Sequence, residues 1–409
     1  MTDATGIKEQ GETRRGALLG AMFLMATAAI GPGFITQTTE FTVTLGAVFA
    51  CAILVSILVD IAVQLNVWRI VGVSGRYAQD LGNKVAPGVG YALAVLIAFG
   101  GLVFNVGNVG GTALGMDALF GLEPKAGGVI SAAVAIGIFL IRKAGVAMDR
   151  IVVVLGIVMI LMTTYVAVVS GPPVGEALTN SVMPLLDPDT VPYLAITTLI
   201  GGTVGGYITY SGAHRMVDTG VTGVDNVKAI SQSSVTGVLV TGVMRVLLFL
   251  AIFGVVAGGT VLGEENPARD AFGAAAGEIG VRVYGIVIWA AAITSVIAAS
   301  YTTVSFFTTF SSWIAKHRNW VTVGFIVLTT IIFVIIGQAP VTLLVLAGSL
   351  NGLILPVGFA VLLWVAARRR DLMGDYRYPS WLLGIGVLAW LLTLYMGWNS
   401  LAGIAELWS

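Results

Sequence analysis

Neutral, oxygen-bearing side chains interrupt several long apolar stretches of this 409-residue chain. Gln37, Asn105, Asn108 and Asn351 each carry an amide oxygen, and Tyr207 carries a hydroxyl group. Such oxygens can coordinate a hard cation directly or contact the water that surrounds it. Polar groups inside apolar segments are costly to bury, so they are functional candidates. These five residues are predicted to line the path of an ion or small solute.

The same polar residues also admit structural interpretations. Asn105, Asn108 and Thr112 follow an i, i+3, i+7 spacing, which places them on one helix face. That face either lines a path or forms hydrogen bonds to a neighbouring helix. Tyr207 fits a packed, hydrogen-bonded tyrosine as well as a site residue. Thr39, close to Gln37, fits a helix cap.

Few charged side chains lie within the apolar runs. Glu40 either attracts cations from outside or lies at the solvated outer interface. Asp60 and Arg245 lie deepest in apolar sequence and are predicted to form a structural ion pair, because an unpaired charge there is costly. Glu40 and Asp60 are also the remaining candidates for proton coupling. His214 and Arg215 are predicted to be helix-end cations at the cytoplasmic side.

The composition excludes most classes of protein. The chain is 57% hydrophobic and only 10% charged, against about 25% charged residues in soluble domains. A soluble enzyme and a nucleic-acid-binding protein are therefore excluded, and a helical membrane protein in a lipid bilayer is expected. One cysteine and two histidines cannot build a Cys/His metal cage or a disulfide framework. No cofactor is expected, and any metal is predicted to be the substrate.

Eleven apolar segments are near the length that crosses about 30 Å of hydrocarbon. They follow a cytoplasmic tail at 1–16 and form a single transport domain over 17–409. No ATP-binding loop is visible, so neither an ATPase nor another enzyme is predicted. The segments are 17–37, 48–68, 88–114, 127–141, 151–170, 192–212, 233–257, 283–305, 319–337, 341–366 and 381–404.

The distribution of Lys and Arg predicts the orientation. With the N-terminus in the cytoplasm, nearly all of the 21 basic residues fall in cytoplasmic segments, including Arg142 and Lys143. Only Lys125, Arg269 and Arg282 fall in outer loops. A multi-pass protein of the plasma membrane is expected, with an extracellular C-terminus after an odd number of spans.

Two spans carry helix breakers near their middle. The first contains Gly-Pro-Gly at 31–33, and the sixth contains glycine pairs at 201–202 and 205–206. Breaks in spans one and six are typical of a five-plus-five inverted repeat with a substrate site at the membrane midplane. The glycines predicted at this site are Gly31, Gly33, Gly202 and Gly205.

These breaks resemble the Nramp family of divalent metal transporters. The family has Asp-Pro-Gly-Asn in span one and Met-Pro-His in span six; this chain has Gly-Pro-Gly-Phe at 31–34 and Gly-Gly-Tyr at 205–207. Further matches are Gly46, Gln64, Val-Ser-Gly-Arg at 73–76 and Leu-Pro at 355–356. The resemblance covers most of spans one to ten. It implies an all-α LeuT-type fold, with a 5+5 inverted repeat, an eleventh helix, and discontinuous helices 1 and 6.

The departures from the family pattern bear on the substrate. Gly31 replaces the metal-binding Asp, Phe34 the Asn, and Gly205 the thioether of Met, a soft ligand suited to transition metals. Asn105 falls near a family Asp. Loss of these ligands implies a wider, wetter cavity and a cation that keeps part of its water, as Mg²⁺ does. The pattern resembles the Nramp-related magnesium transporters.

The expected function is gradient-driven transport of Mg²⁺, and also Mn²⁺, as partly hydrated ions. Proton coupling is expected to be weak or absent, because Gly31, Tyr207 and Gly212 replace the titratable groups of the family. The alternative is an amino-acid or other small organic solute symporter of the same fold. In that case the glycines would make room for a carboxylate and an amine.

Overall fold

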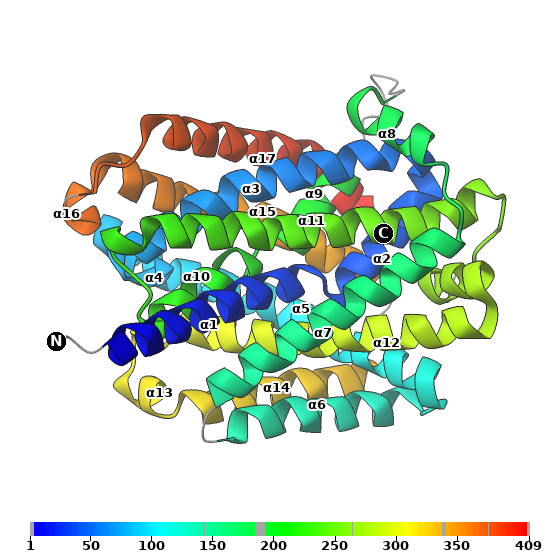
Figure 1. Cartoon of the computed structure of the whole chain (residues 1–409), viewed down its shortest axis with the longest axis horizontal. Helices are drawn as coiled ribbons and strands as arrows, with labels where there is room; N and C mark the ends of the chain where they lie inside the picture. The colour runs from blue at the N-terminus through cyan, green and yellow to red at the C-terminus, as the bar shows by residue number, and fades with distance from the viewer. Residues whose placement is uncertain are drawn as a thin grey trace.

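The computed structural model describes residues 4–141, 144–184, 193–263, 265–337, 341–374 and 376–406. Arg142 and Lys143, two of the expected cytoplasmic cations, lie outside these ranges. The described residues form a bundle of helices and no strand (Figure 1). The prediction of an all-α fold is confirmed.

Helices one and six are discontinuous, as predicted. The first span consists of α1 (Ala4–Ala29) and α2 (Pro32–Leu45), and the sixth of α9 (Tyr193–Thr203) and α10 (Ile208–Thr219). The other spans are α3 (Phe49–Ser74), α5 (Val89–Phe120), α6 (Pro124–Leu140), α7 (Ala144–Val169), α11 (Val227–Ala257), α12 (Pro267–Ser305), α14 (Arg318–Ile336), α15 (Val341–Arg368) and α17 (Ser380–Glu406).

Within the described ranges, eight segments are long and apolar enough to cross a membrane. Three predicted spans are not counted separately among these eight, because none of them is a continuous helix of sufficient length. Two consist of paired half-helices, and α6 has only 17 residues. All eleven predicted segments correspond to helices of the bundle.

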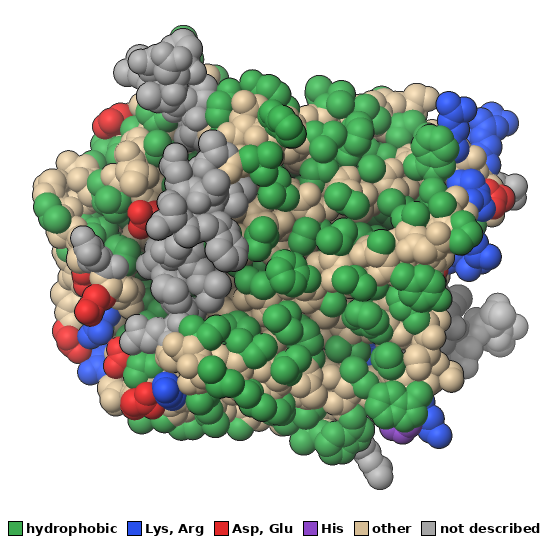
Figure 2. Space-filling model, turned by 180° about the vertical axis from the view of Figure 1, so that it is seen from behind, with side chains coloured by type: hydrophobic (Ala, Val, Ile, Leu, Met, Phe, Trp, Pro, Cys, Tyr) green, Lys and Arg blue, Asp and Glu red, His purple; other side chains and the backbone are tan. Residues whose placement is uncertain are grey.

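The short connecting helices show how the spans alternate. Figure 1 places the N-terminus at the same end of the bundle as α4 (Ala78–Val85), α13 (Ser312–Lys316) and α16 (Arg370–Met373). α8 (Val174–Val182) lies at the opposite end. On the face shown in Figure 2, Lys and Arg side chains gather at one end of a broad hydrophobic band. This arrangement has the alternation that the predicted topology requires.

Several helices extend beyond the apolar segments predicted from the sequence. α1 begins at Ala4, so the sequence expected to be a tail is mostly helical. α12 begins at Pro267 rather than near 283, because an amphipathic segment continues the helix beyond the apolar run and bends at Ala276 and Gly277. The stretch between the fifth and sixth predicted spans contains α8. Hydropathy marks the apolar part of a helix, whereas hydrogen bonding continues into polar sequence.

Small residues allow the sixth and tenth spans to approach closely. A Cβ atom on Gly201 of α9 would lie 1.8 Å from the carbonyl oxygen of Gly348 on α15, and one on Gly352 would lie 2.6 Å from that of Thr197. Only glycine permits this backbone separation, as is typical of membrane helix interfaces. The broken span six is therefore held directly against α15.

Candidate transport site at the two helix breaks

The break in span one is short. Gly31 is extended (φ −81°, ψ 175°) and precedes Pro32, the first residue of α2; no side chain caps this helix end. Proline lacks the amide hydrogen that would continue α1 but suits the first turn of a new helix. Gln37 and Thr39 lie in regular helix, and the Thr39 hydroxyl donates to the Ile35 carbonyl. The interpretation of Thr39 as a cap is wrong.

The break in span six is a turn at Val204–Tyr207. The amides of Val204 and Gly205 both donate to the carbonyl of Ile200, at 2.7 and 3.1 Å. Gly206 has φ +60°, a conformation that favours glycine. The helix then restarts at Ile208. Glycine at 206 is thus required by the backbone, beyond any role in packing.

Gln37 connects the first break to spans six and ten. Its Nε2 atom donates to the Leu344 carbonyl of α15 at 3.0 Å. Its Oε1 atom is buried without a hydrogen-bond partner. A Cβ atom on Gly202 would lie 2.4 Å from this oxygen, so the glycine makes room for it. The Gln37 oxygen is therefore available to a ligand held between α2 and α9.

Asn351 of α15 fills the gap at the second break. Its Nδ2 atom donates to the Ala347 carbonyl at 2.8 Å, whereas its Oδ1 atom is buried and unpartnered. A Cβ atom on Gly206 would lie 1.7 Å from this oxygen, and one on Gly100 would lie 2.4 Å from it. A Cβ atom on Gly205 would meet the Asn351 backbone.

Asn108 of α5 lies at the first break. A Cβ atom on Gly31 would lie 3.4 Å from its Oδ1 atom and 2.9 Å from the Ser295 hydroxyl of α12. Asn108 is fully buried, and neither of its amide atoms has a hydrogen-bond partner. Ser295 donates to the Thr27 carbonyl at the end of α1, at 3.1 Å. Tyr207 lies beside both side chains.

The expectation of a wider, wetter cavity is wrong for this conformation. Gln37 and Asn351 occupy the space that Gly202, Gly205 and Gly206 leave open. Both side chains, like Asn108, are fully buried. Phe104 closes the same region, with its ring 6.0 Å from that of Tyr207 and an atom 3.1 Å from a Cβ placed on Gly33. The breaks are thus packed with neutral polar groups.

Two of the predicted site residues are engaged in hydrogen bonds or ion pairs elsewhere. Asn105 donates to Ser300 at 3.2 Å and to Thr329 at 2.9 Å, so it joins α5 to α12 and α14. Asp60 forms a buried ion pair with Arg245 at 2.6 Å, between α3 and α11. The predicted pairing is confirmed.

The structure also places Glu40 and His214, two further residues discussed from the sequence. Glu40 is half-buried in the later part of α2, beyond the residues that face the break. His214 is not a helix-end cation. Its Nε2 atom accepts from the Ala78 amide at 3.2 Å, and its Nδ1 atom pairs with the Ser305 hydroxyl at 2.7 Å. The ring is fully buried, so this pattern assigns a neutral imidazole protonated on Nδ1.

Sequence reasoning missed Ser295. It lies in the apolar segment at 283–305, where serine and threonine residues are common and commonly bond to their own helix. No spacing in the sequence distinguishes it from Thr294, whose hydroxyl bonds to Ala290 within the helix. Only the crossing of α1 and α12 selects Ser295 as a neighbour of the break.

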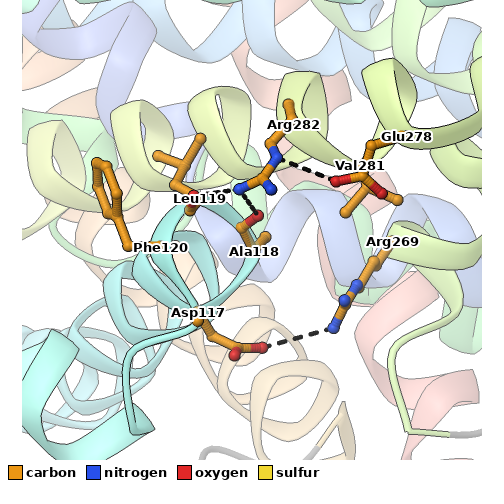
Figure 3. Close-up of a pocket in the computed structure, with 9 residues that line it drawn as sticks. Asp117, Ala118, Leu119, Phe120, Arg269, Glu278, Val281 and Arg282 are labelled. Carbon is orange, nitrogen blue, oxygen red and sulfur yellow. Dashed lines mark hydrogen bonds and ion pairs between the residues drawn. The ribbon is translucent and has the colours of Figure 1, made fainter.

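A surface pocket of about 500 Å³ lies away from the breaks, between the ends of α5 and α12. Figure 3 shows Arg282 directed at Glu278 and at the last carbonyls of α5, and Arg269 directed at Asp117. The two ion pairs measure 3.1 and 3.5 Å. A cation at a helix C-terminus satisfies carbonyls that lack partners in the helix. The two arginines of this pocket therefore stabilise the contact between α5 and α12.

Comparison with known families identifies the chain. The model of the family described as natural resistance-associated macrophage protein-like, Nramp, matches residues 22–403. The chain belongs to the Nramp family. Two relatives are similar over nearly their whole lengths: the uncharacterized membrane protein YcsG of Bacillus subtilis, 51% identical over 96% of each chain, and an uncharacterized membrane protein of Haemophilus influenzae, 50% identical over 94% of each.

Solved structures support the same fold. A manganese transporter of Eremococcus coleocola superposes with a TM-score of 0.75 and 17% identity, over 95% of this chain and 87% of that one. MhsT, solved with L-phenylalanine, superposes with a TM-score of 0.66 and 17% identity, over 93% and 98%. The LeuT-type architecture is therefore shown for this Nramp protein.

The chemistry at the breaks departs from a charged metal site. Among the described residues, no three His, Cys, Asp or Glu side chains come together in a group that could hold a metal. The unpartnered atoms near the breaks include the carboxamide groups of Gln37, Asn108 and Asn351. These groups offer neutral oxygens to a cation, and amide hydrogens to an anion.

Proposed function

We propose that this Nramp protein is a secondary transporter of divalent cations, with Mg²⁺ as the main substrate and Mn²⁺ as a second. The observation that carries the proposal is the pair of buried, unpartnered oxygens that lie against the broken sixth span, Gln37 Oε1 beside Gly202 and Asn351 Oδ1 beside Gly206. Buried polar atoms without partners call for a ligand or an ordered water. Neutral oxygens suit a hard cation that keeps part of its hydration shell.

The proposed selectivity follows from the ligand types. Where the family has methionine, this chain has Gly205, so the site has no thioether at that position. Gly205 lies against the backbone of Asn351. A site without soft ligands gives transition metals little advantage over Mg²⁺. Ca²⁺ prefers more ligands at longer distances and should be a poorer substrate. Transport is driven by the electrochemical gradient, with the N-terminus in the cytoplasm of a plasma membrane.

A second candidate function is symport of a small organic solute. It is favoured by one observation: the described residues at the breaks carry amide and hydroxyl groups but no ionised side chain. A solute with its own charges would need only such neutral partners. Room for it would come from movement of Gln37 and Asn351.

Flux into proteoliposomes tests the proposal. Purified protein should admit Mg²⁺ at a rate well above empty liposomes, Mn²⁺ similarly, and Ca²⁺ more slowly. Gln37→Ala and Asn351→Ala should weaken apparent Mg²⁺ affinity modestly, because contacts made through water are individually weak. Equal Ca²⁺ and Mg²⁺ flux would contradict the selectivity. Uptake of labelled amino acids without any metal flux would favour the second candidate.

A further inference from the structure

The first helix break offers hydrogen-bond donors in an apolar interior. The N-terminus of α2 has no side-chain cap, and its amides follow a proline. Amides of a first helical turn lack partners in their own helix and, with the helix dipole, favour negative charge. Among half-helices in membranes, such ends are where anionic substrate groups bind.

Asn108 is an independent observation at the same place. It is fully buried, and its amide group lies beside the Tyr207 side chain, although neither amide atom has a partner in regular hydrogen-bond geometry. It lies against Gly31, the residue that precedes α2, where a Cβ atom would be 3.4 Å from the Asn108 amide. The side-chain amide group of Asn108 can therefore turn toward a ligand at the helix N-terminus, and the assignment of its oxygen and nitrogen is interchangeable.

The pairing of the buried carboxylates indicates which charge a ligand at the first break would carry. Three buried or half-buried carboxylates, Asp60, Asp149 and Asp218, are each paired with an arginine, at 2.6, 2.6 and 2.7 Å. These three are not free to neutralise a cation at the breaks, and Glu40, which is also half-buried, lies beyond the residues of α2 that face the first break. A doubly charged ion among neutral groups in a low-dielectric interior carries a large desolvation cost. An anion bound beside it would lower this cost.

We propose that the N-terminus of α2, together with Asn108, binds the carboxylate of a small organic anion that accompanies the cation through the protein. The carboxylate accepts hydrogen bonds from the first amides of α2 and from the Asn108 side chain. The cation lies on the side of Gln37 and Asn351, whose unpartnered oxygens lie against Gly202 and Gly206 of the sixth span. This inference rests on the proposed function, because it assigns the anion to the same pair of breaks.

Binding of acetate tests the carboxylate site directly. Thermal unfolding of the purified protein in detergent is measured with sodium acetate, with acetamide as the neutral isostere, and with sodium chloride. Acetate should raise the midpoint temperature saturably, and the other two should not. Asn108→Asp should weaken the acetate response at least about tenfold, because like charges brought together repel. Asn105→Ser, one turn away on α5, is the matched control and should keep the response.

Flux separates this inference from the proposed function. In wild-type proteoliposomes, Mg²⁺ influx should be faster in acetate than in chloride, and Asn108→Asp should remove that dependence by supplying its own carboxylate. Mg²⁺ flux with no acetate effect on flux or unfolding overturns the inference and leaves the cation transporter intact. An acetate response that persists in Asn108→Asp also overturns it. Acetate binding without Mg²⁺ flux in either salt would support the carboxylate site and contradict the cation transporter.

Discussion

At the scale of single residues, the Asp60–Arg245 pair is expected to stabilise the fold and not to carry substrate. Both side chains are almost completely buried, with 2.6 Å between the charged atoms. Asp60→Asn leaves the Arg245 charge uncompensated and should lower the free energy of unfolding by about 3–5 kcal/mol. Thermal unfolding in detergent measures this loss. Replacing both residues with Leu and Met should restore much of the stability, and a single variant as stable as wild type would contradict the interpretation.

The Gly202→Ala variant tests whether transport requires the present position of the Gln37 side chain. Gly202→Ala places a methyl carbon 2.4 Å from the Gln37 oxygen, so the side chain must move. Overpacking of this kind costs about 1–3 kcal/mol of folding stability. Because the Gln37 oxygen is displaced from the proposed site, we also expect roughly a tenfold loss of Mg²⁺ flux, which corresponds to about 1.4 kcal/mol. Gly324→Ala is the control, because a Cβ atom there meets nothing within 4 Å. Full flux in Gly202→Ala would place the transport site elsewhere.

At the scale of elements, the turn between α9 and α10 depends on Gly206 and Asn351 together. Gly206→Ala forces an alanine into the left-handed conformation, which costs about 1–2 kcal/mol. It also places a Cβ atom 1.7 Å from the Asn351 oxygen, where the two atoms clash. Gly121→Ala, with φ +64° and open space around it, isolates the conformational cost. We expect Gly206→Ala to be the less stable variant in thermal unfolding. Adding Asn351→Ala should recover part of that difference; strict additivity would show that the two residues do not interact.

At the scale of the whole molecule, the orientation can be tested by labelling. Glu176 in α8 and Lys316 in α13 are exposed and lie at opposite ends of the bundle (Figure 1). In a Cys51→Ser background, Glu176→Cys should react with a membrane-impermeant maleimide added to intact cells, and Lys316→Cys should react only after lysis. The excess of basic residues at the α13 end gives the physical reason. The reverse pattern would invert the topology.

Energy coupling is also a property of the whole molecule. A potential of 100 mV, negative inside, favours entry of a divalent cation by about 4.6 kcal/mol, so a proton gradient is not needed. We expect Mg²⁺ influx into liposomes without acidification of the lumen, monitored with a pH-sensitive dye. Glu40→Gln should leave influx and luminal pH unchanged. Metal-dependent proton entry that Glu40→Gln abolishes would assign coupling to that carboxylate.

The sequence by itself determined the class of molecule and its broken spans. Hydropathy set the helices because a bilayer requires long apolar segments, and Pro32 with the paired glycines set the breaks because backbone chemistry is local. The pairing of Asp60 with Arg245 was also predictable, because few other charged residues lie deep in apolar sequence.

Only the tertiary structure decided what faces the breaks. Asn105 and Asn108 share a helix face, yet one bonds to Ser300 and Thr329 while the other lies beside Gly31 and Tyr207 at the first break. His214 became a neutral buried ring because α4 presents the Ala78 amide to it. The glycines that implied an open cavity instead admit Gln37 and Asn351. Each outcome depends on contacts between segments far apart in the chain, which spacing along one helix does not encode.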